Sequence, residues 1–326
     1  MKKDLATAVN KNLCIDLGTS NTVIYLKGKG VILNEPSVIA TEKQSDTIVA
    51  IGNEAKAMME RNPDNITIIT PIQKGVVADL DATTAMLKAY IKKAIGVNFS
   101  KNSITVSYPA TSTQVERLAV QDVAKQCVTG QVSLMSQAVA ILLGQEISAT
   151  TPKATAVIDI GAAHTEVSVC IFGEVLSSFN DNVGGNEIDY NIIRYIKNKY
   201  KLQISKSFAC DIKTNIGSAF YTEENKFMDV KGRDIKDNIP KSVTVNSEEI
   251  REVIANTLTE VPNLIIKAIE DLPPQISADL MENDIIIAGG VANLKGLKEY
   301  MENITGLKVK IATNPDTTIA KGLSKY

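Results

Sequence analysis

One histidine and four scattered cysteines leave this sequence with little material for a structural zinc site. Such sites need cysteine and histidine at close spacing, and no pair here has the Cys-x-x-Cys pattern. We expect Cys14, Cys127, Cys170 and Cys210 to be reduced residues of a cytosolic protein. Tryptophan is also absent, and nothing follows from that.

The sequence has neither a long apolar run nor a strong charge of one sign. No apolar stretch approaches the ~18 residues of a membrane-spanning helix, and residue 1 is not followed by a secretory-type apolar segment. A net charge of −2 predicts no general affinity for nucleic acid. These absences favour a cytoplasmic protein, and 326 residues with 44% hydrophobic content suffice for two domains.

The sequence does contain one motif that occurs twice. Around Asp16 and around Asp159 it reads apolar-Asp-apolar-Gly, then three residues, then threonine. The two aspartates are 143 positions apart, and so are Thr22 and Thr165, so the register of the two copies holds. Each copy lies between short apolar runs, which predicts two β-hairpins with glycine in the turn.

Such a hairpin is suited to bind polyphosphate. Glycine lets backbone N–H groups approach the anion, hydroxyl groups add donors, and a carboxylate at the strand end can hold hydrated Mg²⁺. Asp16 and Asp159 are therefore candidate metal ligands, and two ordinary turns with surface aspartates are the alternative. The candidate phosphate contacts are Gly18, Thr19, Ser20, Asn21 and Thr22 in the first hairpin, and Gly161, Ala162, Ala163, His164 and Thr165 in the second.

A third glycine-containing turn follows the apolar run 285–288. Its glycines would let the backbone pack against a flat base or a ribose, although such a pair also ends strands for structural reasons alone. The candidate nucleoside contacts here are Gly289, Gly290, Val291 and Ala292. Periodicity and caps predict helices over 83–95, with Asp81 as cap, 114–126, 188–200, 208–220, 294–303 and 316–323. A further helix is predicted to begin at Ser247, which would be its cap, and to break at Pro262.

The two hairpins and the Gly-Gly turn, in this order, resemble the actin/hexokinase/Hsp70 ATPase superfamily, and within it the MreB family of bacterial actin homologues. The resemblance runs from about residue 13 to 323. It implies an α/β, duplicated actin-like ATPase fold with two lobes, each a mixed β-sheet flanked by helices and bearing a small outer subdomain. Lobe I would take residues 1–140 and 312–326, with its outer subdomain at about 31–72, and lobe II residues 141–311, with its outer subdomain at about 182–246.

The resemblance also implies a function. It is that of a cytoskeletal protein that binds Mg-ATP between two lobes, hydrolyses it weakly and polymerises with itself into filaments supporting cell shape or motility. Gly185 and Lys213 would lie near the nucleotide, while Asn215 stands where the family has a glutamate beside the adenosine. A filament scaffold with almost no ATPase activity is one alternative, and a small-molecule kinase of the same superfamily is another.

The sequence departs from the family where hydrolysis is concerned. Residues 136–138 read Ser-Gln-Ala in place of Glu-Glu-Pro, so both carboxylates are missing. Gln137 can orient water but cannot accept its proton at neutral pH, and a plain polar residue at a helix start is the other interpretation. With Asp159 and Thr165 it forms the candidate catalytic set.

The second hairpin departs as well. Ala162 and Ala163 replace two glycines of the family, at a cost of about 1 kcal/mol if either position needs a positive φ. His164 replaces a threonine and could donate to a phosphate, or could be a neutral surface imidazole. These changes predict slow turnover with binding retained.

Membrane contact is a further expectation drawn from the resemblance. The loop 96–100 carries Val97 and Phe99 between Lys92-Lys93 and Lys101, and a loop of this region touches the membrane in some family members. The protein would then lie at the inner face of the membrane, held by this loop or by residues 1–12. The alternative is a loop whose phenylalanine folds back into the core.

Overall fold

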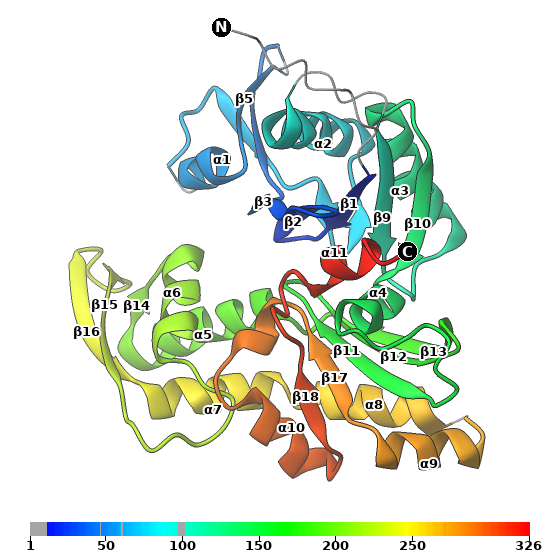
Figure 1. Cartoon of the computed structure of the whole chain (residues 1–326). Helices are drawn as coiled ribbons and strands as arrows, with labels where there is room; N and C mark the ends of the chain where they lie inside the picture. The colour runs from blue at the N-terminus through cyan, green and yellow to red at the C-terminus, as the bar shows by residue number, and fades with distance from the viewer. Residues whose placement is uncertain (1–11, 46, 60, 97–101, 271) are drawn as a thin grey trace, which may run out of the picture. The chain divides into compact units, whose positions relative to one another are not determined.

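The computed structural model describes residues 12–326, except 46, 60, 97–101 and 271. The chain forms two compact units (Figure 1). The lobe bounds expected from the resemblance, with the return at residue 312, stay a prediction. Unit 1 takes the described residues up to Tyr108, Ser112–Ala140 and Ile319–Tyr326, and unit 2 takes Pro109–Thr111 and Ile141–Thr318.

Unit 1 is built on a five-stranded mixed sheet in the order β10-β9-β1-β2-β3. The three N-terminal strands are antiparallel neighbours, and β9 and β10 run parallel to β1. The helices α2 and α3 pack against each other and against this sheet (Figure 1). The bounds are β1 Asn12–Leu17, β2 Asn21–Leu26, β3 Gly30–Pro36, β9 Ser103–Tyr108, β10 Val132–Ser136, α2 Leu80–Ile95 and α3 Gln114–Cys127.

Unit 2 repeats this sheet. Its order is β13-β12-β11-β17-β18, with β11, β12 and β13 antiparallel and β17 and β18 parallel to β11. The helix α8 packs on β12 and β13, and α10 packs on β18. The bounds are β11 Thr155–Ile160, β12 Thr165–Ile171, β13 Glu174–Asp181, β17 Ile285–Ala288, β18 Val309–Ile311, α8 Glu260–Glu270, α9 Pro274–Glu282 and α10 Leu297–Thr305.

Each unit also carries a smaller three-stranded sheet. In unit 1 its order is β5-β4-β6 and α1 lies against it; in unit 2 its order is β14-β15-β16, with α5, α6 and α7 around it. Two mixed sheets with smaller outer sheets confirm the expected α/β architecture. The bounds are β4 Ile39–Glu42, β5 Ile48–Ile51, β6 Ile66–Ile69, α1 Asn53–Met58, β14 Leu202–Gln203, β15 Phe227–Asp234, β16 Pro240–Asn246, α5 Gly185–Tyr200, α6 Lys206–Ile216 and α7 Ser247–Thr257.

Short elements complete the chain. These are β7 Ile72–Gln73, β8 Val76–Val77, α4 Gln137–Gly144, η1 Gly290–Asn293 and α11 Thr318–Leu323. No helix among the residues described above is long and apolar enough to cross a membrane. The residues suggested for membrane contact, Val97, Phe99 and positions 1–11, lie outside the described part of the chain.

Several helix ends differ from the sequence predictions. The cap of α2 is Asp79, which accepts from Ala82 N at 2.9 Å, rather than Asp81. The break after α7 comes at residues 258–259, ahead of Pro262, because proline is tolerated in the first turn of α8. The predicted helix 208–220 ends at Ile216, where α6 gives way to Gly217.

Candidate functional site

The first hairpin makes a turn that presents backbone donors. Gly18 N donates to Asn21 O at 3.0 Å, and a Cβ on Gly18 would lie 2.6 Å from that oxygen, so the turn requires glycine. Ser37 satisfies two carbonyl groups of the turn, since its Oγ donates to Gly18 O and its backbone N donates to Ser20 O. In the described chain, the N–H groups of Thr19 and Ser20 donate to no protein acceptor. They are left for a ligand.

The side chains of this turn are used within unit 1. The hydroxyls of Thr22 and Ser37 lie 2.9 Å apart in a buried hydrogen bond. Thr19 Oγ1 accepts from Gly75 N, and Asn21 Nδ2 donates to Asn34 Oδ1 at 2.7 Å. The turn is therefore held rigid by its side chains, and its backbone supplies the donors for an anion.

Asp16 is the next-to-last residue of β1 and carries a buried carboxylate. It is 8% exposed and accepts from Ser107 Oγ at 2.6 Å and from Gln137 Nε2 at 3.3 Å. Burial raises the pKa of Asp16, although the two donors act to lower it. A carboxylate that has lost water without gaining a cationic side chain is suited to a metal ion.

Gln137 begins α4 directly after β10 and is 6% exposed. Its amide nitrogen holds Asp16, while its Oε1 and the neighbouring Ser136 Oγ are buried without a hydrogen-bond partner in the described residues. An unpartnered buried acceptor needs a donor, and a water molecule can supply one. The placement of Gln137 therefore fits a residue that orients water beside Asp16.

The second hairpin presents donors in the same way. Gly161 N donates to His164 O at 3.0 Å. The carbonyls of Gly161 and Ala162 accept from Gly185 N and Asn186 N, at 3.0 Å and 2.7 Å. Over the described ranges, the N–H groups of Ala162 and Ala163 have no protein acceptor.

Neither Ala162 nor Ala163 has a positive φ. The backbone strain expected for alanine at a positive φ is therefore absent at these two positions.

His164 is buried in this turn, not a surface imidazole. It is 9% exposed, and neither ring nitrogen has a hydrogen-bond partner in the part of the chain that the structure describes. Burial lowers its pKa, against an opposing effect of Glu166, so the ring is neutral. Glu166 itself is engaged elsewhere, accepting from Ala110 N and from Thr111 N and Oγ1 at 2.8–3.0 Å.

Asp159 and Thr165 lie on the two strands of this hairpin, where Asp159 pairs with Glu166 and Thr165 with Ile160. Thr165 Oγ1 donates to Val183 O at 2.7 Å, so its hydroxyl fixes the next loop. Asp159 is 8% exposed, and Gly289 packs against it with a φ of +87°. A Cβ on Gly289 would lie 2.4 Å from Asp159 Oδ1, so only glycine fits this close approach.

Lys213 on α6 reaches the same region of unit 2. Its Nζ forms an ion pair with Asp189 Oδ1 at 2.7 Å and donates to Gly185 O at 2.9 Å. A Cβ on Gly185 would lie 3.3 Å from Nζ and 3.4 Å from Val291 Cγ2. The sequence therefore pointed to residues that unit 2 does bring together, but it gave no role to Asp189, which pairs with the lysine.

Each unit thus assembles its own set of candidate residues. Unit 1 gathers its hairpin with Asp16 and Gln137, and unit 2 gathers its hairpin with Asp159, Lys213 and the two loops around Gly185 and Gly289. Among the described residues there is no group of three or more His, Cys, Asp or Glu side chains that could hold a metal. A metal here would therefore need water or ligand oxygens to complete its coordination.

Comparisons with known proteins agree on one family. The family model described as MreB/Mbl protein matches residues 10–326. The cell shape-determining protein MreB of Escherichia coli is 35% identical over 331 residues, covering 100% of this chain and 95% of that protein.

Solved structures show the same fold. The AMPPNP-bound structure of MreB 5 of Spiroplasma citri matches with a TM-score of 0.92 and 31% identity, over 96% of this chain and 95% of that one. A structure titled MamK double helical filament matches with a TM-score of 0.80 and 19% identity, over 96% and 97% of the two chains, and supports the fold only.

Proposed function

Since the chain belongs to the MreB/Mbl family of actin-like cytoskeletal proteins, we propose that it binds Mg-ATP and polymerises with itself into filaments. The observation that carries this is the pair of matched hairpins, each with free backbone N–H groups beside a buried aspartate. Nucleotide in a 31% identical relative supports the ligand. The cell-shape names of the relatives support the cellular role, and they disfavour a kinase.

The residues present fit Mg-ATP. The N–H groups of Thr19, Ser20, Ala162 and Ala163 would bind phosphate oxygens, as in other backbone anion sites. Asp16 and Asp159 would hold hydrated magnesium, which neutralises phosphate charge when bound. In unit 2, the Gly289 loop and Lys213 would lie along the nucleoside.

Hydrolysis is proposed to be slow. Gln137 can orient a water molecule through its free Oε1, but its amide cannot take the proton of that water. The positions on either side of it are serine and alanine, so this segment supplies no carboxylate. The alternative, a nucleotide-binding scaffold with almost no ATPase activity, is not favoured by the cell shape-determining relatives.

Pelleting and phosphate release from Mg-ATP, measured together, test the function. We expect wild type to pellet with nucleotide and release phosphate slowly, and Gln137→Glu to release it faster because a carboxylate can accept the proton. Gln121→Glu makes the same change at a partly exposed position of α3 and should behave as wild type. If the protein does not pellet in a nucleotide-dependent way, the filament proposal fails. If the wild-type protein releases phosphate rapidly, Gln137 is sufficient for hydrolysis and the proposal of slow turnover is wrong.

We also propose that the protein is cytoplasmic and touches the inner membrane face through Val97 and Phe99. This rests on the sequence, in which two apolar side chains lie between lysines. Flotation with anionic vesicles tests it: Phe99→Ser should reduce binding several-fold. Equal flotation of variant and wild type would assign any contact to the N-terminal segment instead.

A further inference from the structure

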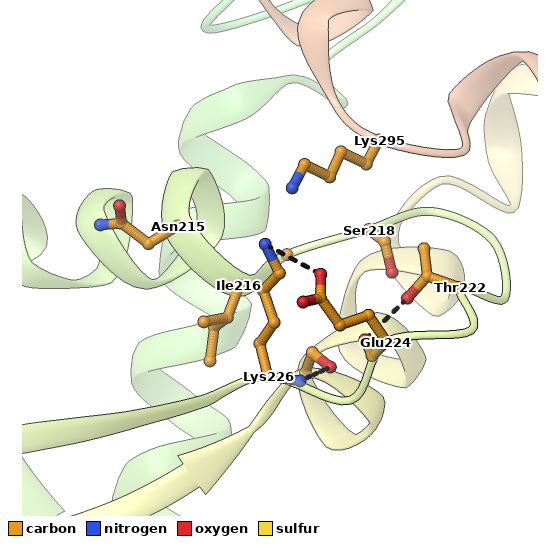
Figure 2. A pocket seen from close by; sticks show the side chains of 9 residues that line it. Asn215, Ile216, Ser218, Thr222, Glu224, Lys226 and Lys295 are labelled. Atoms are coloured by element: carbon orange, nitrogen blue, oxygen red, sulfur yellow. Dashed lines mark hydrogen bonds and ion pairs between the residues drawn. The ribbon is translucent and has the colours of Figure 1, made fainter.

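Unit 2 contains a cavity of about 110 Å³ that none of the proposed nucleotide contacts lines. Its volume is several times the ~30 Å³ share of a water molecule. It lies between the end of α6, the segment leading to β15, the start of α7 and the loop before α10 (Figure 2). Its lining residues are Asn215, Ile216, Gly217, Ser218, Thr222, Glu224, Lys226, Ser247 and Lys295.

Two lysines meet in this cavity. Figure 2 shows the side chains of Lys226 and Lys295 pointing toward one another. Lys226 has a partner in Glu224, at 3.3 Å. Within the described residues, no carboxylate forms an ion pair with Lys295. The Lys226 ammonium group lowers the pKa of Lys295, as expected for like charges held together.

The backbone around Lys295 is held in place by hydrogen bonds to a neighbouring segment. Ala219 N donates to Lys295 O at 2.7 Å, and Ser218 pairs with Lys295 as a β-bridge. Gly296, the next residue, has a φ of +71° and packs against Phe220, where a Cβ would lie 2.9 Å away. The segment at Ser218–Ala219 and the loop that carries Lys295 are thus joined by backbone hydrogen bonds. This holds the Lys295 ammonium group at the cavity.

The remaining side chains suit an anion. Ser218 is 3% exposed and lines the cavity. Glu224 is the one carboxylate in the lining; its side chain is 78% exposed, so it can turn to solvent when an anion takes its place. A tetrahedral oxyanion would accept hydrogen bonds from both lysines and from Ser218 and would relieve their repulsion.

We propose that this cavity binds a small phosphate-type oxyanion through Lys226, Lys295 and Ser218. The proposed nucleotide contacts do not line the cavity, but Asn215, which stands where the family has a glutamate beside the adenosine, lies in its lining. The proposal does not depend on whether the chain hydrolyses ATP. The group that binds is either free inorganic phosphate or the phosphate of a small monoester, and the experiment distinguishes the two.

Calorimetric titration of the full chain with inorganic phosphate and with glycerol 3-phosphate, at constant ionic strength, tests the proposal. Lys295→Gln should weaken binding roughly tenfold, because it removes a charged hydrogen bond. Glu224→Gln should strengthen it several-fold by removing the competing carboxylate. Lys298→Gln is the matched control, since Lys298 is a half-exposed lysine three residues away that lies 3.9 Å from Glu302.

The titrations are repeated with saturating Mg-ADP. We expect the Lys295-dependent binding to persist, and binding of phosphate but not glycerol 3-phosphate would identify the free anion. Binding of neither probe, or equal binding by wild type and Lys295→Gln, overturns the proposal. If the chain does not bind ADP, the proposed function fails while the comparison of Lys295→Gln with Lys298→Gln still decides this site.

Discussion

At the scale of single residues, Gly289 and Gly290 are neighbours with different requirements. Gly289 has a φ of +87° and would place a Cβ 2.4 Å from Asp159 Oδ1, whereas a Cβ on Gly290 meets nothing within 4 Å. We predict that Gly289→Ala loses about 1–3 kcal/mol of unfolding free energy, plus nucleotide affinity, because strain and displacement of Asp159 add. Gly290→Ala should stay near wild type in urea unfolding. Equal behaviour of the two would mean that the close packing is not as described.

His164 offers a prediction in pH. Its pKa is lowered by burial, so below its ordinary value of about 6.5 the unfolded chain binds a proton that the folded chain does not. His164 therefore lowers stability as pH falls from about 6.5, by at most about 1.4 kcal/mol per pH unit.

His164→Thr should remove this component. The measurement is urea unfolding at pH 7.5, 6.5 and 5.5, and the difference between variant and wild type isolates the only histidine in the chain. The contributions of other titratable groups, such as Asp16, are present in both proteins and cancel in this difference. A difference that is constant with pH would contradict a buried neutral imidazole.

Site residues that lie within a sequence motif could be predicted, whereas residues that contact the motif from distant positions in the sequence could not. Asp16 and Asp159 follow from the repeat itself. Ser107 could not be predicted, because it is 91 positions from Asp16 and reaches it only when β9 pairs in parallel with β1. The role of Asp189 could not be predicted for a similar reason, since its pairing with Lys213 depends on how α5 and α6 pack.

At the scale of elements, apolar periodicity placed the helices but not their caps. Several side chains compete to cap a helix, and the choice depends on the approaching chain. At α7 the predicted cap Ser247 is the first helical residue, and Asn246 accepts from Glu249 N at 3.0 Å while Glu249 accepts from Asn246 N. This reciprocal arrangement is a capping box.

Glu249 also joins α7 to α5, since Tyr195, Lys199 and Tyr200 donate to its carboxylate. Glu249→Ala should therefore lose at least about 2 kcal/mol of stability, as both a cap and several charged hydrogen bonds disappear. Glu248→Ala, which removes only an exposed pair with Arg251 at 3.6 Å, should cost less than about 0.5 kcal/mol in the same unfolding assay. Similar losses in both would argue against this linkage.

At the scale of the whole molecule, the repeat predicted the duplication. Both large sheets have the same order and the same strand directions, with the repeated motif at the same turn in each. The sequence could not show that residues 109–111 leave unit 1, because that depends on contacts such as Glu166 with the backbone of Ala110 and Thr111. Those contacts explain why residues 109–111 belong to unit 2.

The aspartates of the two units allow the contribution of magnesium to be measured on the intact protein. Mg-ATP at about 100 times its dissociation constant should stabilise wild type by roughly 2.7 kcal/mol, and ATP with EDTA should stabilise it less. Asp16→Asn and Asp159→Asn should each reduce this magnesium-dependent difference. Asp16→Asn should not destabilise the free protein, because burial already disfavours the charge it removes.

A buried aspartate away from both hairpins serves as the control for this measurement. Asp234 is paired with Lys241 at 2.9 Å, and its pKa is lowered to about 2 by that ammonium group and by backbone donors. Asp234→Asn should lower the thermal midpoint of the free protein yet keep the full magnesium-dependent increment. If Asp16→Asn and Asp159→Asn keep that increment as well, neither carboxylate holds the metal, and the hairpins bind phosphate through their backbone alone.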